Sequence, residues 1–324
     1  MTTPPAPAEP AGWPSRTGVP ARLDLVDTLG PTLSFELYPP RSEPAMDALW
    51  RTIPQLTQAA PDFLSITYGA SGSSRETSRA VVRRVLAETD ILPVAHLTCI
   101  GSPREEVRRV AEEFLADGVR DFLALRGDPP AGVIDWTPHP RGLQTAAELV
   151  ALLREMDETI GIAAAATPSA VVGTPLPDGR LPQAPLPGDL LALLAKQAAG
   201  AQYAITQVFF EVETYVRYLA VARAAGVHLP LLPGLVPLDD PARLRRLQEI
   251  SGVPVPAWIL EVLEAEVDEE RRRAAGAAMG AELAQQVIAA GAPGLHLYTF
   301  NQHRASLALL ERAALTRRPV GAPA

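Results

Sequence analysis

Short β-rich runs alternate with helical patterns along most of this chain. Most of the runs are apolar nearly throughout, which is typical of parallel strands covered on both faces. We expect strands at 33–37, 62–67, 92–98, 121–125, 160–165, 203–208, 229–235 and 294–299. The segment 102–118 illustrates the helical pattern, with Ser102 and Glu105 as a predicted capping box. In it Pro103 takes the first helical position and Gly118 ends the pattern.

Eight strands with helices between them predict a (β/α)8 TIM barrel, an α/β fold, that fills residues 22–315 as a single domain. An open doubly wound sheet is the alternative, but such a sheet usually carries a Gly-rich turn after its first strand, and "ELYPPRSEP" offers none. The Pro-rich residues 1–21 are expected to form a disordered tail, and residues 316–324 a short C-terminal tail. The stretch 168–188 is dense in Pro and Gly and is longer than a normal loop of this fold.

Composition narrows the class of protein. The net charge of −8 argues against a nucleic-acid partner, because such binding depends on a basic surface. One cysteine, Cys99, excludes an internal disulfide framework and any Cys-rich metal site. No apolar stretch approaches the ~20 residues of a membrane span, and the N-terminal residues lack the pattern of a secretory signal. We therefore expect a cytoplasmic protein that contacts neither nucleic acid nor membrane.

Polar residues stand where several predicted strands end. In a barrel these ends meet at one mouth, where reacting groups gather, so Glu36, His96, Asp128 and Gln207 are expected to converge. Each has a structural alternative: Glu36 could pair with a buried Arg, and His96 could be a hydrogen-bonded core histidine. Their co-location favours chemistry, because unpaired polar groups are costly to bury.

The residue types suggest a reaction on a nitrogen heterocycle. A Glu in a partly dry site can act as a general acid near neutral pH. An Asp can accept two N–H bonds from the edge of a ring such as a pterin, and a Gln can donate to and accept from the same kind of ring. No metal site is expected, because no HxxxH or HxH pattern appears.

Several motifs together resemble a known family. "SFELYPPR", "SITYGASGS", "AHLTCIG", "ALRGDPP", "AITQVFFEVETY", "LPGLVP" and "LHLYTFN" occur in the order and approximate spacing of the 5,10-methylenetetrahydrofolate reductases. The resemblance runs over about residues 30–312. It implies a barrel that binds FAD at its mouth, takes hydride from NADH or NADPH, and reduces methylenetetrahydrofolate to 5-methyltetrahydrofolate for one-carbon metabolism and methionine synthesis.

The resemblance also assigns residues. It implies that Glu36 protonates N10 of the folate, that Asp128 is catalytic and meets the pterin, and that Gln207 and Tyr298 bind the substrate. The implied cofactor-binding positions are Thr67, His96, Arg126, Gly127, Asp128, Ala146, Ala165, Asp189 and Lys196. Other positions depart from the family pattern and remove cofactor contacts: Thr145, Thr167, Val171, Ala192 and Ala195.

These departures leave alternatives open. We expect FAD to be retained with altered contacts, while a flavin-independent reductase of the same substrate and a non-catalytic barrel that binds folate or flavin remain alternatives. Retention of Glu36, Asp128 and Gln207 argues against the non-catalytic barrel, because a binding module has no need of a general acid. The expected partner is a small-molecule folate, and the chain is expected to form a homo-oligomer. The sequence does not choose between NADH and NADPH.

Overall fold

Residues 18–68, 72–129, 137–171 and 186–315 are described by the computed structural model. All its strands are parallel and form one sheet, in the order β7-β6-β5-β4-β3-β2-β1-β9-β8. The strands are β1 Thr32–Leu37, β2 Phe63–Ile66, β3 Leu92–Thr98, β4 Asp121–Leu125, β5 Gly161–Ala166, β6 Tyr203–Thr206, β7 Leu231–Leu232, β8 Gly234–Leu235 and β9 Gly294–Tyr298. The predicted TIM barrel is confirmed, and each predicted run contains at least one strand.

The barrel closes through one interrupted strand. The predicted strand at 229–235 is present as two short pieces, β7 and β8, because Pro233 between them has no N–H for the ladder. β7 pairs with β6 on one side, and β8 pairs with β9 on the other. These two pieces of one segment therefore join the two edges of the sheet.

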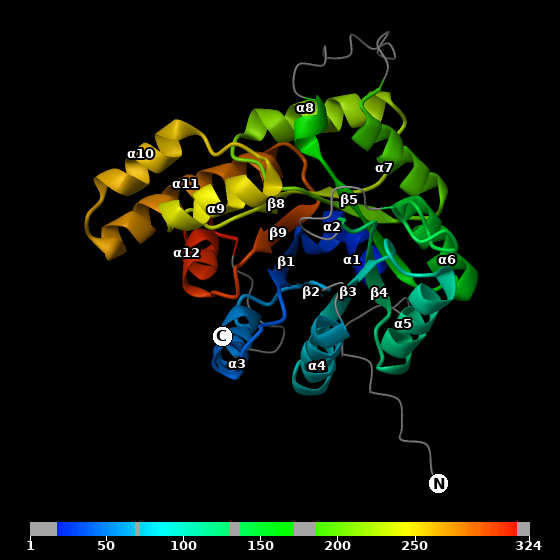
Figure 1. The fold of residues 1–324 in the computed structure, drawn as a ribbon. Helices are drawn as coiled ribbons and strands as arrows, with labels where there is room; N and C mark the ends of the chain where they lie inside the picture. Colours follow the sequence, from blue (N-terminus) through cyan, green and yellow to red (C-terminus); the bar gives the residue numbers. More distant parts are fainter. Residues whose placement is uncertain (1–17, 69–71, 130–136, 172–185, 316–324) are drawn as a thin grey trace.

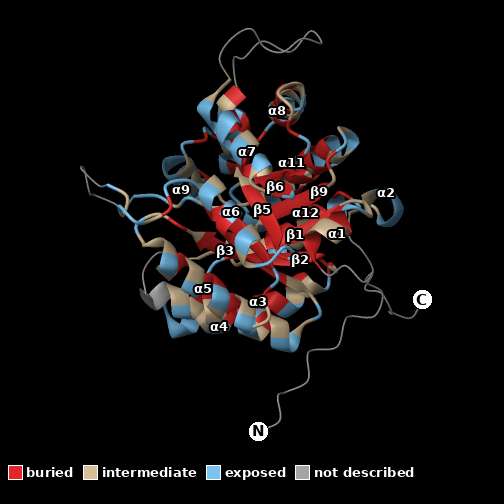
Figure 2. Cartoon of the chain, turned by 90° about the vertical axis from the view of Figure 1, so that its right-hand side faces the viewer, coloured by how far each residue is buried: buried red, intermediate tan, exposed pale blue. Residues whose placement is uncertain are grey.

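Helices surround this sheet, and their exposed faces turn outward while the strands are buried at the centre (Figures 1 and 2). The long helices are α3 Glu43–Thr57, α4 Gly72–Glu88, α5 Arg104–Ala116, α6 Ala146–Met156, α7 Gly188–Ala198, α8 Val212–Ala224, α9 Pro241–Ser251, α10 Ala257–Ala265, α11 Glu269–Ala289 and α12 Arg304–Arg312. The short ones are α1 Val19–Leu23, α2 Val26–Leu29 and the 3₁₀ turn η1 Pro168–Val171. Outward-facing strand residues such as Phe35 and Leu37 pack against the helices in the main core.

Helix α5 corrects one detail of the sequence interpretation. Pro103 stands at its N-cap position, one residue before the helix, and no side chain caps its N-terminus, so the predicted capping box is wrong. The Ser102 hydroxyl instead accepts a hydrogen bond from Arg75 at 3.5 Å. Gly118 follows the helix with a φ of 106°, a left-handed conformation that glycine adopts without strain, and so ends it as predicted.

The amino-terminal end of the barrel is closed by α1. Val19 and Leu23 of this helix are buried against inward-facing strand residues, among them Phe63 and Leu123. Residues 19–21 were expected in the disordered tail, so the predicted boundary at residue 22 is too late. Val19 is fully buried among these inward-facing side chains, which gives this part of the Pro-rich segment a fold. The rest of that tail, the C-terminal tail and residues 172–185 of the Pro-rich loop lie outside the described residues.

Two buried carboxylates anchor this closed end. The Arg22 Nε donates to Asp62 Oδ1 at 2.6 Å, and the backbone N–H of Leu33 donates to Asp62 Oδ2 at 2.7 Å. The N–H of Val19 donates to Asp121 Oδ1 at 3.0 Å, and burial raises the pKa of Asp121 to about 7. Both carboxylates therefore hold the N-terminal segment to the barrel.

Candidate active site

Strand alternation places Glu36 at the mouth of the barrel. Residues i and i+2 of a strand share a face, so Ser34 and Glu36 point inward where Phe35 points outward. The neighbouring strand β9 repeats this pattern, and its register sets Ser34 beside His296 and Glu36 beside Tyr298. The side chain of Glu36 is 22% exposed, so the carboxylate sits at the boundary between the packed interior and solvent.

Two imidazoles face this carboxylate. Nε2 of His96, on β3, and Nε2 of His296, on β9, each lie 3.7 Å from the same oxygen, Glu36 Oε2. Burial lowers the pKa of His96 to about 4, although the charge of Glu36 opposes the shift, so this ring is neutral near pH 7. In the part of the chain that the structure describes, Glu36 forms no ion pair with Arg or Lys. The alternative of a buried Arg partner is therefore not supported.

Each imidazole is held by a serine from an adjacent strand. Ser34 Oγ lies 2.8 Å from Nδ1 of His296, and Ser65 Oγ lies 2.5 Å from Nε2 of His96. His96 is thus hydrogen-bonded and buried, as its structural alternative expected, and it also faces the acid. These contacts fix both rings in the wall of the barrel.

Tyr298 is held from the other side of the mouth. Its hydroxyl donates to the carbonyl of Thr206 at 2.8 Å, and burial raises its pKa well above the usual range. A side chain at Gly234 would lie 2.6 Å from the ring of Tyr298, so only glycine fits there. Tyr298 is therefore a neutral phenol with its proton already engaged.

The turn after β9 secures the backbone next to Glu36. Phe300 and Asn301 adopt φ values of 52° and 56°, an uncommon left-handed pair for residues with side chains. The Asn301 side chain accepts from the N–H of Tyr38 at 3.0 Å and donates to the carbonyl of Tyr38 at 2.8 Å. The Thr299 hydroxyl donates to the carbonyl of Glu36 at 2.7 Å. This turn therefore fixes the loop that carries the chain away from Glu36.

The other predicted substrate residues lie at the same end of the barrel. Asp128 is exposed just beyond β4, and Gln207 directly follows β6. Gln207 Oε1 accepts from the N–H of Val208 at 2.9 Å, which fixes the carbonyl side of its amide. Neither residue hydrogen-bonds to Glu36 among the described residues, so their joint role in binding stays a prediction.

The predicted cofactor positions differ in what they offer to a ligand. Arg126 and Asp189 are exposed at the end of β4 and the start of α7. Lys196 is only 9% exposed and donates to the carbonyl of Ala165 at 2.6 Å, and burial lowers its pKa to about 8. Its ammonium therefore already has one partner within the protein.

At three further predicted cofactor positions, Thr67, Gly127 and Ala146, the structure shows a role for the backbone rather than for the side chain. Thr67 donates its N–H to Leu37 and accepts at its carbonyl from the hydroxyl of Ser78. Gly127 has a φ of 87°, and a side chain there would lie 2.8 Å from Ile100, so the turn requires glycine. Ala146 begins α6.

Two of the residues that depart from the family pattern have local explanations. Thr145 caps α6, since its side chain accepts from the N–H of Glu148 at 3.2 Å. Val171 is fully buried in the core. Ala192 and Ala195 are exposed on α7, where they offer no polar contact. Capping therefore accounts for Thr145 and packing for Val171, while Ala192 and Ala195 have no structural explanation.

Sequence reasoning missed His296 and both serines. The signal was present in "LHLYT", because a histidine two residues before Tyr298 must share its inward face once the strand is recognised. Ser34 precedes Glu36 by the same spacing, and Ser65 faces Glu36 across the β1–β2 register. Small hydroxyls in apolar strands carry little signal until the register between strands is known.

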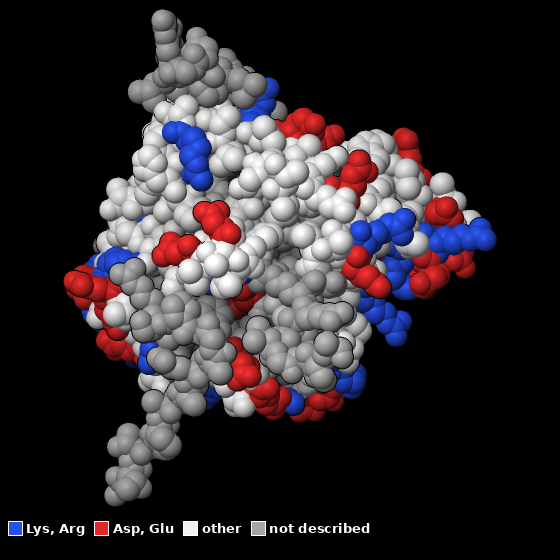
Figure 3. Space-filling view, turned by 180° about the vertical axis from the view of Figure 1, so that it is seen from behind, with Lys and Arg blue, Asp and Glu red and all other residues white. Residues whose placement is uncertain are grey.

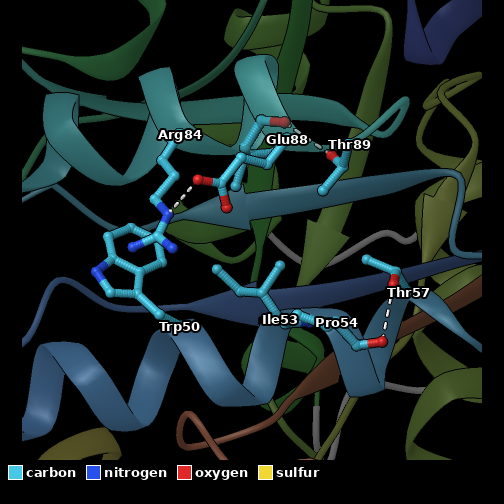
Figure 4. A pocket seen from close by; sticks show the side chains of 8 residues that line it. Trp50, Ile53, Pro54, Thr57, Arg84, Glu88 and Thr89 are labelled. Atoms are coloured by element: carbon cyan, nitrogen blue, oxygen red, sulfur yellow. Dashed lines mark hydrogen bonds and ion pairs between the residues drawn. The ribbon is translucent and has the colours of Figure 1, made fainter.

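A groove between α3 and α4 lies on the outer wall of the barrel, away from the mouth (Figure 4). The Arg84 guanidinium lies 4.1 Å from the centre of the Trp50 ring and pairs with Glu88 at 2.7 Å. The hydroxyl of Thr57 donates to the carbonyl of Pro54 within its own helix. These polar groups satisfy one another, and they add nothing to the site at Glu36.

Among the described residues, no group of three or more His, Cys, Asp or Glu side chains could hold a metal ion. The same part of the chain contains no helix long and apolar enough to cross a membrane. On the face drawn in Figure 3, basic and acidic residues are interspersed rather than gathered into a basic surface.

In (β/α)8 barrel enzymes the active site lies at the carboxyl-terminal mouth, which is where this chain places Glu36. The family model "Methylenetetrahydrofolate reductase" matches residues 23–314. The chain therefore belongs to the methylenetetrahydrofolate reductase family, as the motifs indicated.

Curated relatives agree with this assignment. The chain is 33% identical over 278 residues to the 5,10-methylenetetrahydrofolate reductase of Salmonella typhimurium, covering 86% of this chain and 88% of the relative. The Escherichia coli protein of the same name is 32% identical over the same shares. A probable methylenetetrahydrofolate reductase (NADH) of Oryza sativa is 31% identical, covering 87% of this chain but 48% of that longer protein.

Among solved structures, an uncharacterized protein from Clostridium thermocellum that binds two copies of 5-methyl-5,6,7,8-tetrahydrofolic acid has a TM-score of 0.60. It is 15% identical and covers 91% of this chain and 97% of its own. At this identity the likeness supports the fold alone.

Proposed function

We propose that this protein reduces 5,10-methylenetetrahydrofolate to 5-methyltetrahydrofolate with NADH or NADPH. The observation that carries the proposal is Glu36, a carboxylate at the mouth that lies between two imidazoles and forms no ion pair with Arg or Lys in the described chain. Membership of a reductase family favours catalysis over a role in binding alone.

Glu36 acts as the acid. Its carboxyl donates a proton to N10 of the folate, which opens the five-membered ring to an iminium that can accept hydride. The barrel supports this step by limiting solvent at the carboxyl and by fixing the adjacent backbone through Thr299. The carboxylate that remains recovers its proton from solvent at the mouth.

Asp128 and Gln207 orient the pterin. The Asp128 carboxylate is exposed, so it can accept two N–H bonds from the pterin edge without first breaking an internal ion pair of the described chain. The Gln207 amide has its oxygen engaged with Val208, which leaves the NH₂ side to donate to the ring. Tyr298 contributes its ring surface, because its hydroxyl is bound to Thr206.

The described residues fit FAD in part. Arg126 offers an exposed cation for a diphosphate, and Asp189 offers an exposed acceptor for a ribose hydroxyl. When bound, the flavin supplies a carrier that takes hydride from the nicotinamide and passes it to the one-carbon unit. We propose FAD with these contacts, and place Lys196 as a support for β5 rather than for the diphosphate.

A flavin-independent reductase is the second candidate, in which hydride passes directly from the nicotinamide to the folate. The inward bond of Lys196 and the alanines at 192 and 195 favour it, because they leave fewer polar contacts for a dinucleotide. Both candidates use Glu36 in the same role.

One purification tests both candidates. Protein purified without added cofactor is expected to be yellow, with absorption in the flavin bands, and to oxidise NADH or NADPH when methylenetetrahydrofolate is present. Colourless protein that catalyses this reaction without added FAD rejects the flavin candidate. Protein that oxidises neither nucleotide with the folate, even after FAD is supplied, rejects the proposed reaction.

The assembly and the location of the protein remain proposals. A homo-oligomer in the cytoplasm, contributing 5-methyltetrahydrofolate to methionine synthesis, is what the sequence predicts. Gel filtration with light scattering measures the oligomeric state.

A further inference from the structure

The backbone of β1 keeps its alternation for one residue beyond the end of the strand. The carbonyl of Glu36 accepts a hydrogen bond at 2.7 Å from the turn after β9, and the carbonyl of Leu37 accepts one at 2.9 Å from the residue after β2. Tyr38 turns back to the β9 side, where the Asn301 side chain accepts from its N–H at 3.0 Å and donates to its carbonyl at 2.8 Å. Tyr38 therefore extends β1 by one residue, with Asn301 in the place of a neighbouring strand.

This conformation places the ring of Tyr38 on the same face as Glu36. Side chains at i and i+2 of an extended chain share a face, and Tyr38 follows Glu36 by two residues. Pro39 favours this conformation, because a proline disfavours the helical region for the residue before it. Ser34 and Glu36 point into the barrel, so Tyr38 lies above them at the rim of the mouth.

The ring of Tyr38 is open to solvent. Tyr38 is 46% exposed, and among the aromatic residues that the structure describes only Trp258 is comparably exposed. Tyr38 belongs to none of the three apolar clusters of the described chain. Packing of the core therefore does not explain why Asn301 holds both backbone groups of this residue.

Asn301 is itself held in place by two elements. Its N–H donates to the hydroxyl of Thr299 at 3.2 Å, and its carbonyl accepts from the hydroxyl of Thr52, on α3, at 3.3 Å. Asn301 and the preceding Phe300 both have the left-handed φ values given above, a conformation that costs free energy in residues with side chains. The turn thus accepts backbone strain in a conformation that brings the Asn301 amide to Tyr38.

The proposed reaction identifies a ring for this exposed surface. Glu36 protonates N10 of the folate, and N10 is the nitrogen that the p-aminobenzoyl ring carries. The pterin lies on the other side of N10, where Asp128 and Gln207 orient it. Tyr38 is the next residue on the inward face after Glu36, about 7 Å further along the chain towards solvent. A folate that brings N10 to Glu36 therefore directs its p-aminobenzoyl ring to the rim beside Tyr38.

We propose that Tyr38, held by Asn301, is a substrate-binding residue whose ring packs against the p-aminobenzoyl ring of the folate. The inference rests on the proposed function, and in particular on the role of Glu36 at N10. Two aromatic rings in this position gain free energy from offset or edge-on contact.

The nearby aromatic residues are less available for this contact. Tyr298 pairs with Glu36 in the strand register, one step deeper than Tyr38, and its hydroxyl is bound to Thr206. Phe300 packs against an apolar cluster, and the guanidinium of Arg243 lies 5.3 Å from the centre of its ring.

The first test detects the contact directly. In protein that is deuterated except at its six tyrosine rings, bound 5-methyltetrahydrofolate is expected to show NOEs between its p-aminobenzoyl protons and a tyrosine ring. Tyr38→Phe, with the new ring deuterated, should remove these NOEs. NOEs that persist unchanged in Tyr38→Phe overturn the proposal.

The second test measures binding by calorimetry. Tyr38→Ala is expected to raise the Kd of 5-methyltetrahydrofolate about tenfold, whereas Tyr38→Phe keeps the ring and should change it less than about twofold. Trp258→Ala is the matched control, since it removes a comparably exposed aromatic ring from α10 on the outside of the barrel (Figure 1). It should leave this Kd unchanged.

A truncated ligand shows which part of the folate is affected. 6-Methyltetrahydropterin lacks the p-aminobenzoyl group, so its inhibition constant should be the same for Tyr38→Ala and the unaltered protein. An equal loss for both ligands, or an unchanged Kd for 5-methyltetrahydrofolate, overturns the proposal. A raised KM for NADH with an unchanged Kd for the folate would assign the ring to the nicotinamide and would also overturn it.

Asn301→Gly tests the positioning of the ring. Glycine adopts the left-handed conformation without strain, so this variant removes only the amide that holds Tyr38. The Kd of 5-methyltetrahydrofolate should rise about threefold, and the same substitution in Tyr38→Ala should have almost no further effect. Equal effects in the two backgrounds would show that Asn301 does not act through Tyr38.

The proposed function can fail separately from this inference. A protein that binds 5-methyltetrahydrofolate with the expected NOEs but does not reduce methylenetetrahydrofolate counts against the reaction and supports the contact. A protein that reduces methylenetetrahydrofolate but shows no loss of binding in Tyr38→Ala supports the reaction and overturns the contact.

Discussion

The two ends of the barrel bury ionisable groups in opposite ways. At the amino-terminal end Asp62 receives the guanidinium of Arg22 and the N–H of Leu33, and Asp121 receives the N–H of Val19. At the carboxyl-terminal end the charged or titratable neighbours of Glu36 in the described chain are two imidazoles at 3.7 Å, and a ring nitrogen of His296 has no hydrogen-bond partner among the described residues.

This contrast shows what separates a structural carboxylate from a reactive one. A carboxyl that holds the fold takes hydrogen bonds from the chain itself, because an unpaired buried charge costs stability. A reactive carboxyl must keep some of its hydrogen-bonding capacity free for the substrate. Among the described residues, the carboxylate at the mouth therefore receives no hydrogen bond from the chain, whereas each of the two carboxylates at the closed end receives at least one.

The largest expected effect is at the mouth. Glu36→Gln is isosteric but cannot donate a proton to N10, so folate reduction should fall by about 10²- to 10⁴-fold. Reduction of a quinone dye by NADH should persist, because that half-reaction does not need the acid. Stopped-flow measurement of the two half-reactions checks this, and a parallel fall of both would make Glu36 a structural residue like Asp62.

Breaking the ion pair at the closed end should lower the stability of the fold and leave the activity nearly unchanged. Arg22→Ala leaves Asp62 buried without its cation, and the free energy of unfolding should fall by about 3–5 kcal/mol. Activity measured well below the melting temperature should change little, since the pair lies at the opposite end from Glu36. Urea denaturation gives the stability; an unchanged midpoint would contradict the structural role of the pair.

A smaller effect is expected at the exposed carboxylate of the mouth. Asp128→Asn keeps the shape of the side chain but weakens its bonds to the pterin, so kcat/KM for the folate should fall about 10- to 100-fold. Retention of flavin, measured by absorbance after gel filtration, should fall much less. Equal loss of folate turnover and flavin would show that Asp128 serves the cofactor instead.

The smallest effect concerns pH at the closed end. Burial raises the pKa of Asp121 to about 7 from the model-compound value of 3.8, so the folded protein binds a proton that the unfolded chain has released. Stability should therefore decline as the pH rises from about 4 to 7, by on the order of 2 kcal/mol from this group. Asp121→Asn keeps the bond to Val19 and removes the titration, so its unfolding free energy should vary less over that range. Thermal melts at several pH values compare the two proteins, and identical slopes would show that Asp121 does not titrate there.

Much of the fold could be predicted because its signals are local. Parallel strands buried on both faces read as apolar runs, and their alternation with helical patterns specifies a barrel. The sequence-based prediction was wrong for two details that depend on contacts with a distant part of the chain. Ser102 bonds to Arg75 instead of capping α5, and the N-terminal residues around Val19 fill a space that exists only when the strands have closed.

The features of the candidate active site also fall into those that the sequence predicts and those that depend on tertiary contacts. By itself the sequence determined the family, the barrel and the placing of Glu36, Asp128 and Gln207 at the carboxyl ends of three different strands, because strand order and chain punctuation are local properties. Only the tertiary structure decided the partners: that His296 meets Glu36, that Ser34 bonds the far nitrogen of that ring, and that Lys196 turns inward to Ala165. The physical reason is that a hydrogen bond depends on the register between strands far apart in the chain, and that register is set when the barrel packs and closes.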